Sequence, residues 1–116
     1  MMKPKLKVKF YISDSGKEPV RQWLKSLSPP NRKIIGNDIK TVQFAWPVGM
    51  PLVRHVSGHT KMWEIRSSLD FGIARVIFTI YNDYTVLLHG VIKKSQKIEK
   101  KDLALAEKRK KRFFRN

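Results

Sequence analysis

Alternating apolar and polar residues recur from Leu52 to Ile92, and this pattern constrains the fold more than any other feature of the chain. A period of two is typical of β-strands with one buried face. It predicts strands at residues 52–56, 61–68, 73–81 and 84–92. The turns at residues 69–72 and at Asn82-Asp83 are short enough to require antiparallel hairpins. The second half of the chain is therefore predicted to form a meander of strands.

The flanking segments predict one more strand and three helices. Alternation over residues 5–12 indicates a first strand, and apolar residues at helical spacing up to Leu27 indicate a helix. A second helix begins near Pro29 and ends before Pro47, since proline suits the start of a helix and disrupts its continuation. Its predicted buried stripe consists of Ile34, Ile35, Ile39 and Val42. The fourth segment, residues 99–114, is helix-prone and predicted to bury Leu103, Ala106 and Phe113.

These elements define an α+β fold with a small antiparallel β-sheet and helices packed on one sheet face. A chain of 116 residues suits a single domain spanning residues 1–116. The amino terminus lacks the apolar core of a secretion signal, and no apolar run reaches the eighteen residues that span a bilayer. The absence of cysteine fits a reducing compartment. We therefore expect a cytoplasmic protein without a membrane partner.

The charge of the chain points to a polyanionic partner. Twenty-five Lys and Arg against nine Asp and Glu give a formal net charge of +16. Such an excess destabilises the folded state by self-repulsion unless polyanions neutralise it. Residues 93–116 alone contain eleven Lys or Arg and three acidic residues, a net charge of +8. Nucleic acid is the polyanion that this charge favours.

Strand register predicts a pair of arginines side by side. A turn centred between Asp70 and Phe71 places Trp63 opposite Phe78 and Ile65 opposite Val76. The same register places Arg66 opposite Arg75. Matching apolar pairs support this register, but two like charges directly opposite each other are unfavourable unless an anion lies between them. The planar guanidinium group suits phosphate as that anion, because it binds phosphate oxygens bidentately.

The next hairpin extends this candidate site towards a run of lysines. A two-residue turn at Asn82-Asp83 pairs Arg75 with Gly90, which leaves the sheet beside Arg75 open. The same register places Leu87, His89 and Val91 on the core face. Lys94 then leaves the strand on the arginine side if the extended conformation lasts that far. The predicted site consists of Arg66, Arg75 and Lys94, with Lys93 and Lys97 around it.

An alternative explains the arginines without a ligand. Glu64 lies on the same face as Arg66 and diagonal to Arg75, so it could hold both arginines in a surface ion network of little energetic value.

The histidines carry a weaker signal. His89 lies in an apolar strand, where a hydrogen-bonded core position competes with an acid or base role. His55 and His59 bracket a turn-like stretch and are surface residues that could also titrate near neutrality. No cysteine, acidic ligand spacing or glycine-rich phosphate loop accompanies them, so neither a metal nor another cofactor is expected. Phosphate chemistry would then depend on cationic side chains.

Several motifs together resemble one known family. They are Trp63-Glu64-Ile65-Arg66, Gly72-Ile73-Ala74-Arg75, the string from His89 to Lys97, and a following helix with Ala106 and Arg109. This set is similar to RelE/HigB-type toxins of type II toxin–antitoxin modules, particularly their phage-associated branch. The resemblance covers roughly residues 5–114, and the string His89 to Lys97 is its most specific part.

The resemblance implies an α+β endoribonuclease, an mRNA interferase that enters the ribosome and cuts translated mRNA without metal. The 2′-hydroxyl attacks the neighbouring phosphate and leaves a 2′,3′-cyclic phosphate and a 5′-hydroxyl. Arg66, Arg75 and Lys94 would be the catalytic residues. RNA-binding cations would be Lys61, Lys93, Lys97, Arg109 and Arg112. A tyrosine found at the end of some relatives is replaced here by Phe113 and Phe114, which excludes a phenolic acid there.

The family also implies a cognate antitoxin, which we expect to be of the helix-turn-helix type, beside the mRNA and ribosome. Two other functions compete with this prediction. A non-catalytic RNA-binding or ribosome-associated module would explain the charge alone and would bind RNA in a salt-dependent manner. A DNA-binding regulator would need a recognition helix, and neither the second nor the last predicted helix shows a helix-turn-helix pattern.

Overall fold

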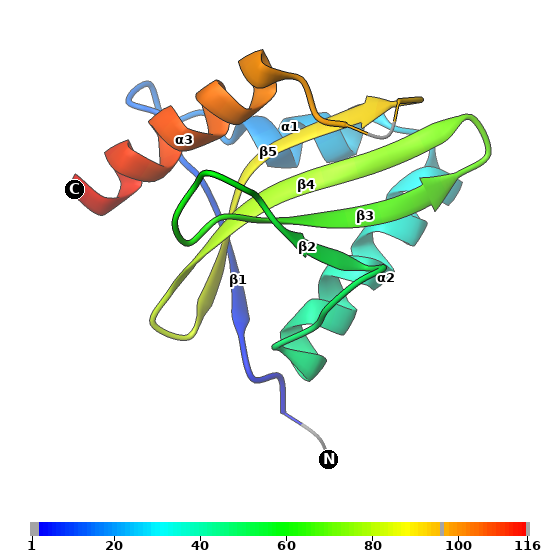
Figure 1. Cartoon of the computed structure of the whole chain (residues 1–116), viewed down its shortest axis with the longest axis horizontal. Coiled ribbons are helices and arrows are strands. Elements are labelled where there is room, and N and C mark those ends of the chain that lie inside the picture. Colours follow the sequence, from blue (N-terminus) through cyan, green and yellow to red (C-terminus); the bar gives the residue numbers. More distant parts are fainter. Residues whose placement is uncertain (1–2, 96, 116) are drawn as a thin grey trace.

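The computed structural model describes residues 3–95 and 97–115 (Figure 1). Gln96, a member of the string that carries the family resemblance, lies outside the described residues, as do Met1, Met2 and Asn116. Eight elements follow one another in the described part: β1 (Lys7–Phe10), α1 (Pro19–Ser26), α2 (Pro29–Ala45), β2 (Val53–His55), β3 (Trp63–Leu69), β4 (Gly72–Tyr81), β5 (Tyr84–Lys93) and α3 (Lys100–Arg115). The predicted α+β class and order of elements are confirmed.

The strands form one mixed sheet with the order β1-β5-β4-β3-β2 across its described part. β3, β4 and β5 pair antiparallel, as the short turns predicted. β2 also pairs antiparallel with β3. β1 instead pairs parallel with β5, with Lys7 opposite Tyr84 and Phe10 opposite Leu87. No hairpin joins these two strands, so turn length could not fix their relative direction.

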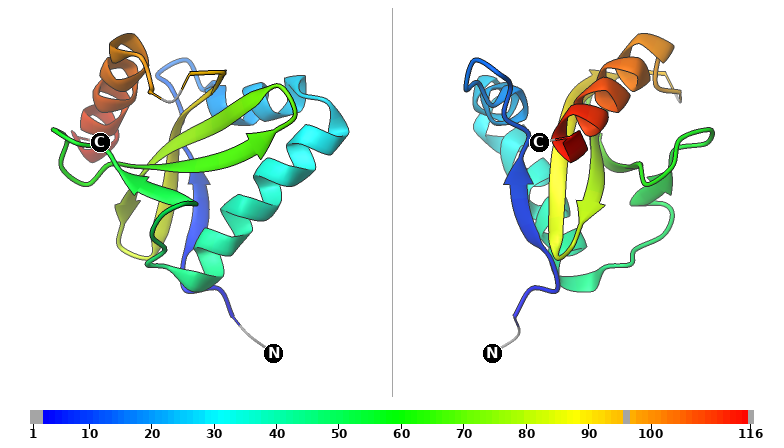
Figure 2. Two further views of the ribbon diagram at one scale, coloured as in Figure 1. Left: turned by 45° about the vertical axis from the view of Figure 1, so that its right-hand side comes forward. Right: turned by 90° about the vertical axis from the view of Figure 1, so that its left-hand side faces the viewer.

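Helices cover both faces of the sheet, so the prediction that they share one face is wrong. α1 and α2 pack on one face, where Val20, Ile35 and Val42 meet Phe78 and Leu87 among other core residues. α3 packs on the opposite face (Figure 2), in a second core cluster that contains Met62, Ile77, Leu88 and Ala106 with Leu103 and Phe113 beside them. The reason is that β4 buries side chains on both of its faces from Ala74 to Thr79. A strand buried on both faces needs a cover on each side.

The buried stripe of α2 is narrower than predicted. Ile35, Ile39 and Val42 are buried, whereas Ile34 is 40% exposed and belongs to the solvent side. Successive helical residues differ by about 100° in direction, so Ile34 and Ile35 cannot both face the sheet squarely. In the described part of the chain, no helix combines the length and apolar character that a membrane crossing requires.

The register between β3 and β4 is the predicted one. Trp63 lies opposite Phe78, and Ile65 lies opposite Val76. Arg66 lies opposite Arg75. The apolar pairs face α1 and α2, because Ile65, Val76 and Phe78 belong to that core. The arginines therefore project from the other face, the one that α3 partly covers.

The register between β4 and β5 follows the prediction only as far as Phe78 and Leu87. A shift between Ile77 and Phe78 then pairs Ile77 with His89 and Arg75 with Val91. The predicted pair Arg75 and Gly90 is therefore wrong, as is the placement of His89 on the face of Leu87. An extra residue in β5, the signature of a β-bulge, reverses the alternation beyond Leu87.

The bulge directs Leu88 and His89 towards α3 and turns Gly90 towards α1. A Cβ atom at Gly90 would overlap three atoms of the Trp23 indole ring. Gly90 is thus required for the close packing of Trp23 on the sheet, and it does not open a space beside Arg75. This replaces the predicted role of the glycine.

We expect Gly90→Ala to lower the free energy of unfolding by about 1–3 kcal/mol, because the added methyl group forces Trp23 or β5 to move. Gly36→Ala is the matched control. A Cβ at Gly36 meets no atom within 4 Å, and alanine in a helix stabilises by about 0.5–1 kcal/mol relative to glycine. Urea unfolding of both variants measures these changes, and equal stability of Gly90→Ala and the wild type would contradict the packing described.

Candidate active site

A carboxylate and two arginines form a compact cluster on the α3 face of the sheet. Glu64 and Arg66 project from β3, and Arg75 projects from β4 directly opposite Arg66. Glu64 Oε1 lies 3.5 Å from Arg66 Nε and 4.0 Å from Arg75 Nε. The carboxylate therefore contacts both guanidinium groups and offsets the repulsion between them.

Two members of the cluster are buried and Arg66 is partly buried, unlike the surface ion network considered as an alternative. Arg75 is fully buried and Glu64 is only 4% exposed. Burial raises the pKa of Glu64 above its ordinary value, although Arg75, Arg66 and Arg54 act in the opposite direction. Burial also lowers the pKa of Arg75, against the attraction of Glu64. Charges held in this way are costly, and such sites are often functional.

The guanidinium group of Arg75 uses only part of its hydrogen-bonding capacity. One of its terminal nitrogens donates a hydrogen bond to the Ser95 carbonyl oxygen at 2.8 Å. Its Nε and Nη1 are buried and make no hydrogen bond within residues 3–95 and 97–115. Leaving a buried donor without an acceptor costs about 1–3 kcal/mol. An anion that accepted these bonds would relieve that cost.

An open cavity of about 220 Å³ lies beside the cluster. Its lining comes from β2 and the loop after it, from β3, and from the segment that enters α3: Arg54, His55, Val56, Ser57, Glu64, Lys97, Ile98 and Leu103. Glu64 is thus shared between the buried cluster and the cavity. A ligand in the cavity would meet a carboxylate, cationic side chains and an apolar wall.

Of the predicted lysines, Lys97 lines the cavity and is exposed. Lys93 is the last residue of β5, and its Nζ lies 2.8 Å from Glu99 Oε1. This hydrogen bond raises the pKa of Lys93, so the lysine stays charged. Lys94 is exposed in the bend that follows β5. The extended conformation needed to direct Lys94 towards the arginines therefore ends one residue too early.

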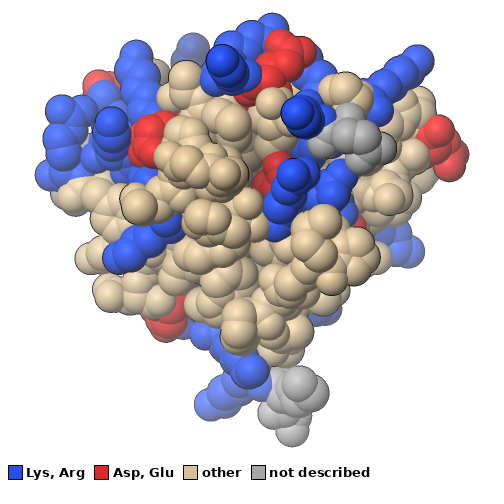
Figure 3. Space-filling model, in the orientation of Figure 1, with Lys and Arg blue, Asp and Glu red and all other residues tan. Residues whose placement is uncertain are grey.

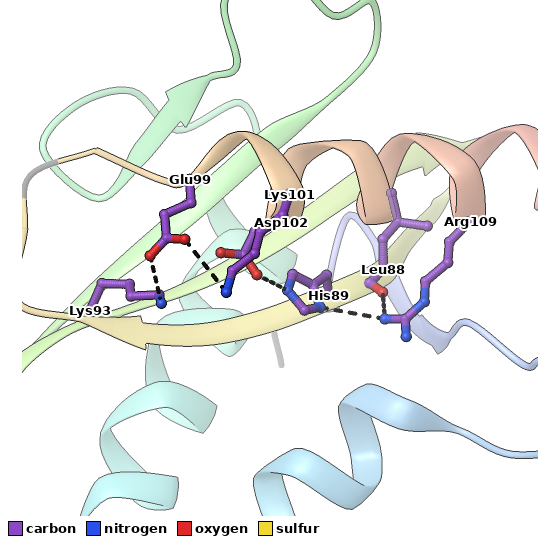
Figure 4. Close-up of polar contacts among 7 residues, drawn as sticks. All are labelled: Leu88, His89, Lys93, Glu99, Lys101, Asp102 and Arg109. Carbon is purple, nitrogen blue, oxygen red and sulfur yellow. Dashed lines mark hydrogen bonds and ion pairs between the residues drawn. The ribbon is translucent and has the colours of Figure 1, made fainter.

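His89 is tied into a network that joins β5 to α3 (Figure 4). Its Nε2 lies 2.8 Å from Asp102 Oδ1, and its Nδ1 lies 3.5 Å from Arg109 Nη1. Arginine can only donate, so Nδ1 accepts and Nε2 carries the proton that Asp102 accepts. Arg109 also donates to the Leu88 carbonyl oxygen at 2.7 Å. Both ring nitrogens of His89 are therefore engaged in holding α3, which favours the structural interpretation.

The two remaining histidines and Lys61 differ in their relation to the cavity. His55 is exposed, packs edge-on against Trp63 and lines the cavity. His59 is not among the lining residues of the cavity. Its Nδ1 instead lies 2.8 Å from Glu107 Oε1 on α3. Lys61 is exposed in the connection between β2 and β3.

Arg112 is ion-paired with Asp14, and the guanidinium of Arg109 also stacks over the Tyr11 ring. Figure 3 shows many Lys and Arg side chains over α3 and beside the end of β5, with few acidic side chains among them. Lys61 and Arg112 can serve only this wider basic surface.

The structure adds Arg54 and Glu64 to the site residues predicted from sequence. Arg54 lies directly opposite Glu64 in the pairing of β2 with β3. The sequence marked β2 only as a short strand without a register, so Arg54 was missed. Glu64 was recognised as a partner of the arginines, but its burial and its place in the cavity wall were not visible in the sequence. Within the described residues, no three His, Asp or Glu side chains gather to hold a metal ion.

Fold and site together define a small basic α+β protein with a buried carboxylate and arginine cluster at the wall of an open cavity. The chain belongs to the family described as Phage derived protein Gp49-like (DUF891), whose model matches residues 22–111. This family belongs to the RelE superfamily of toxins, and the fold is compatible with a RelE-like one. The expected superfamily is thereby confirmed. No curated protein matches the chain.

We expect Asp102→Ala to lower the free energy of unfolding by about 1–3 kcal/mol, because it removes the acceptor of the partly buried His89 Nε2–H group. Asp102→Asn keeps an acceptor oxygen and should cost less. Asp83→Ala is the control, since its ion pair with Lys7 is exposed at 3.7 Å and should change stability by no more than about 0.5 kcal/mol. Urea unfolding distinguishes the three, and equal losses for Asp102→Ala and Asp83→Ala would show that the network does not stabilise α3.

Proposed function

We propose that this protein is the HigB-like toxin of a toxin–antitoxin system and acts in the cytoplasm as a metal-independent endoribonuclease on ribosome-bound mRNA. The observation that carries the proposal is the buried cluster of Arg66, Arg75 and Glu64 beside a cavity lined by further cations. Membership of a toxin-like family of phage origin supports the toxin role. The net charge of +16 supports RNA as the partner.

The proposed reaction needs positively charged hydrogen-bond donors at the phosphate oxygens. The 2′-oxygen attacks the adjacent phosphorus while the bond from phosphorus to the 5′-oxygen breaks, and negative charge develops on the phosphate oxygens. Arg75 has hydrogen-bond donors available for those oxygens, and Arg66 lies directly across the hairpin. Donors aimed at developing charge accelerate such reactions strongly, because they are held in place before the reaction begins.

The lysines and the arginines of α3 have different roles in the proposed function. Lys97 lines the cavity and would contact the RNA backbone close to the reacting phosphate. Lys93, kept charged by Glu99, would contribute positive potential rather than accept a proton. Lys94 lies at the surface beyond β5 and would bind RNA at the edge of the site, together with Lys61 and Arg112. Arg109 is engaged with Leu88 and His89 and would act through α3.

Toxin-family membership implies an antitoxin partner. We propose one of the helix-turn-helix type that carries an acidic segment over the cavity. A protein with this charge presents a surface to which an acidic segment is attracted over roughly one Debye length, about 8–10 Å. Covering the cavity would exclude RNA and stop the proposed reaction.

We expect Arg66→Lys to lower the cleavage rate about a hundredfold, because lysine keeps the charge but loses the planar fork that binds phosphate oxygens. Arg75→Lys should have a similar or larger effect. The control is Arg21→Lys, a change on α1 at an arginine paired with Glu18 on the opposite side of the molecule. Primer extension on translated mRNA, with and without ribosomes, maps the cuts and their rates.

Cuts that carry cyclic-phosphate ends and depend on ribosomes support the proposal. RNA binding without cleavage by the wild type would instead identify a non-catalytic RNA-binding module. Equal cleavage by Arg66→Lys, Arg75→Lys and the wild type would remove the arginines from the mechanism.

A further inference from the structure

We infer that Glu64 accepts the proton of the attacking 2′-hydroxyl group, an inference that rests on the proposed ribonuclease function and deepens it. The proposed reaction requires such an acceptor, because a neutral hydroxyl group is a weak nucleophile. The functional residues that the resemblance carries over to this chain are Arg66, Arg75 and the lysines at positions 93, 94 and 97, none of which is a carboxylate. The geometry points to Glu64 by its position and by the state of the competing groups.

Glu64 lies where the proposed reaction needs a base. A general base must come within hydrogen-bond reach of the proton that it removes. Among the described residues, Glu64 is the one carboxylate in the cavity lining, and the same carboxylate contacts Arg66 and Arg75. A phosphate that engages the two arginines would therefore lie next to Glu64, and its neighbouring 2′-hydroxyl group would lie within reach.

The competing bases are occupied. Asp102 and Arg109 engage both ring nitrogens of His89. His59 is bound to Glu107, which in turn contacts Lys110 at 3.0 Å. Lys93 is held in its charged state by Glu99. His55 lines the cavity but is exposed and packs edge-on against Trp63.

The surroundings of Glu64 suit a base. The charged and titratable residues around it are Arg54 and His55 of β2, Arg66 of β3, Arg75 of β4, and Lys97 of the segment before α3. Burial strengthens the carboxylate as a base by raising its pKa, and the cations limit that rise. A base works best when its pKa lies close to the working pH but still allows ionisation.

The distances leave the cluster free to change partners. At 3.5 and 4.0 Å, the contacts of Glu64 with the two Nε atoms are longer than charge-assisted hydrogen bonds, which measure about 2.7–2.9 Å. A phosphate can therefore take the guanidinium donors of Arg75 without breaking short bonds to the carboxylate. Glu64 would then be left facing the hydroxyl group.

The step balances in atoms and charge. The carboxylate takes the hydroxyl proton as the bond between the 2′-oxygen and phosphorus forms. The bond between phosphorus and the 5′-oxygen breaks, and that oxygen takes a proton from solvent through the open side of the cavity. Glu64 leaves the step as a neutral acid and returns its proton to water. No metal or redox partner enters the step.

The kinetic test uses Glu64→Gln, which keeps the shape of the side chain but removes its basicity. We expect cleavage of mRNA on purified ribosomes to fall about 10²–10⁴-fold, while RNA binding stays equal or becomes tighter because a negative charge is lost. Glu64→Asp should retain part of the activity. Glu107→Gln is the matched control, because it removes a partly buried carboxylate that contacts His59 and Lys110 away from the cavity.

The pH profile separates a base from a positioning residue. The wild type and Glu107→Gln should lose activity as the pH falls through the raised pKa of Glu64, whereas the residual activity of Glu64→Gln should lack this acidic limb. Cleavage by Glu64→Gln within threefold of the wild type, or the same acidic limb in that variant, would overturn the inference. Absence of any cleavage by the wild type would refute the proposed function itself and the inference with it.

Thermal unfolding provides the second readout. Because the pKa of Glu64 is raised in the folded protein, its contribution to stability is fully present below the unfolded-state pKa and is lost as the pH rises through the folded-state value. We expect Glu64→Gln, which resembles the protonated form, to melt no lower than the wild type at neutral pH and to lose this advantage in acid. A lower melting temperature at neutral pH would instead show that Glu64 serves to hold the arginines.

Discussion

The register between β3 and β4 governs this structure, because it sets both the site and the main core. The pairing that places Arg66 opposite Arg75 also places Ile65 opposite Val76. A slip of one residue would turn the arginines into the core beneath α1 and α2 and move apolar side chains to the other face. On that face Glu64 contacts both arginines, with its Oε1 3.5 Å from Arg66 Nε and 4.0 Å from Arg75 Nε.

The bulge in β5 is the second constraint, and it links the site to α3. By turning both Leu88 and His89 towards α3, it gives Asp102 and Arg109 their partners. Those contacts fix the start of α3 and the segment before it, which supplies Lys97, Ile98 and Leu103 to the cavity wall. The same segment brings the Ser95 carbonyl oxygen onto Arg75. The cavity therefore depends on the β-bulge in β5, although its lining residues come from other segments.

The β3–β4 register, and with it the opposition of Arg66 and Arg75, was predictable from the sequence because one short turn and matching apolar pairs act together. The positions of His89 and Gly90 were not predictable, because an extra residue in β5 leaves no local mark in an apolar run. The burial of Glu64 was likewise not predictable, since it depends on tertiary contacts between segments far apart in the sequence. The parallel pairing of β1 was hidden for the same reason.

The distribution of acidic residues explains how a chain of such charge remains folded and still attracts a polyanion. Apart from Asp70, every acidic side chain contacts a polar or cationic partner, namely Asp14, Glu18, Asp38, Glu64, Asp83, Glu99, Asp102 and Glu107.

These acids neutralise cations locally, at helix ends, in hairpins and between elements. They are too few to form an acidic surface, so the remaining Lys and Arg keep a positive potential over the molecule. Where this surface reaches the cavity, the acid in the wall is Glu64. In the proposed function, the surface cations attract RNA and Glu64 accepts the proton. Substitutions at the surface should therefore change association, and substitutions in the cluster should change the reaction.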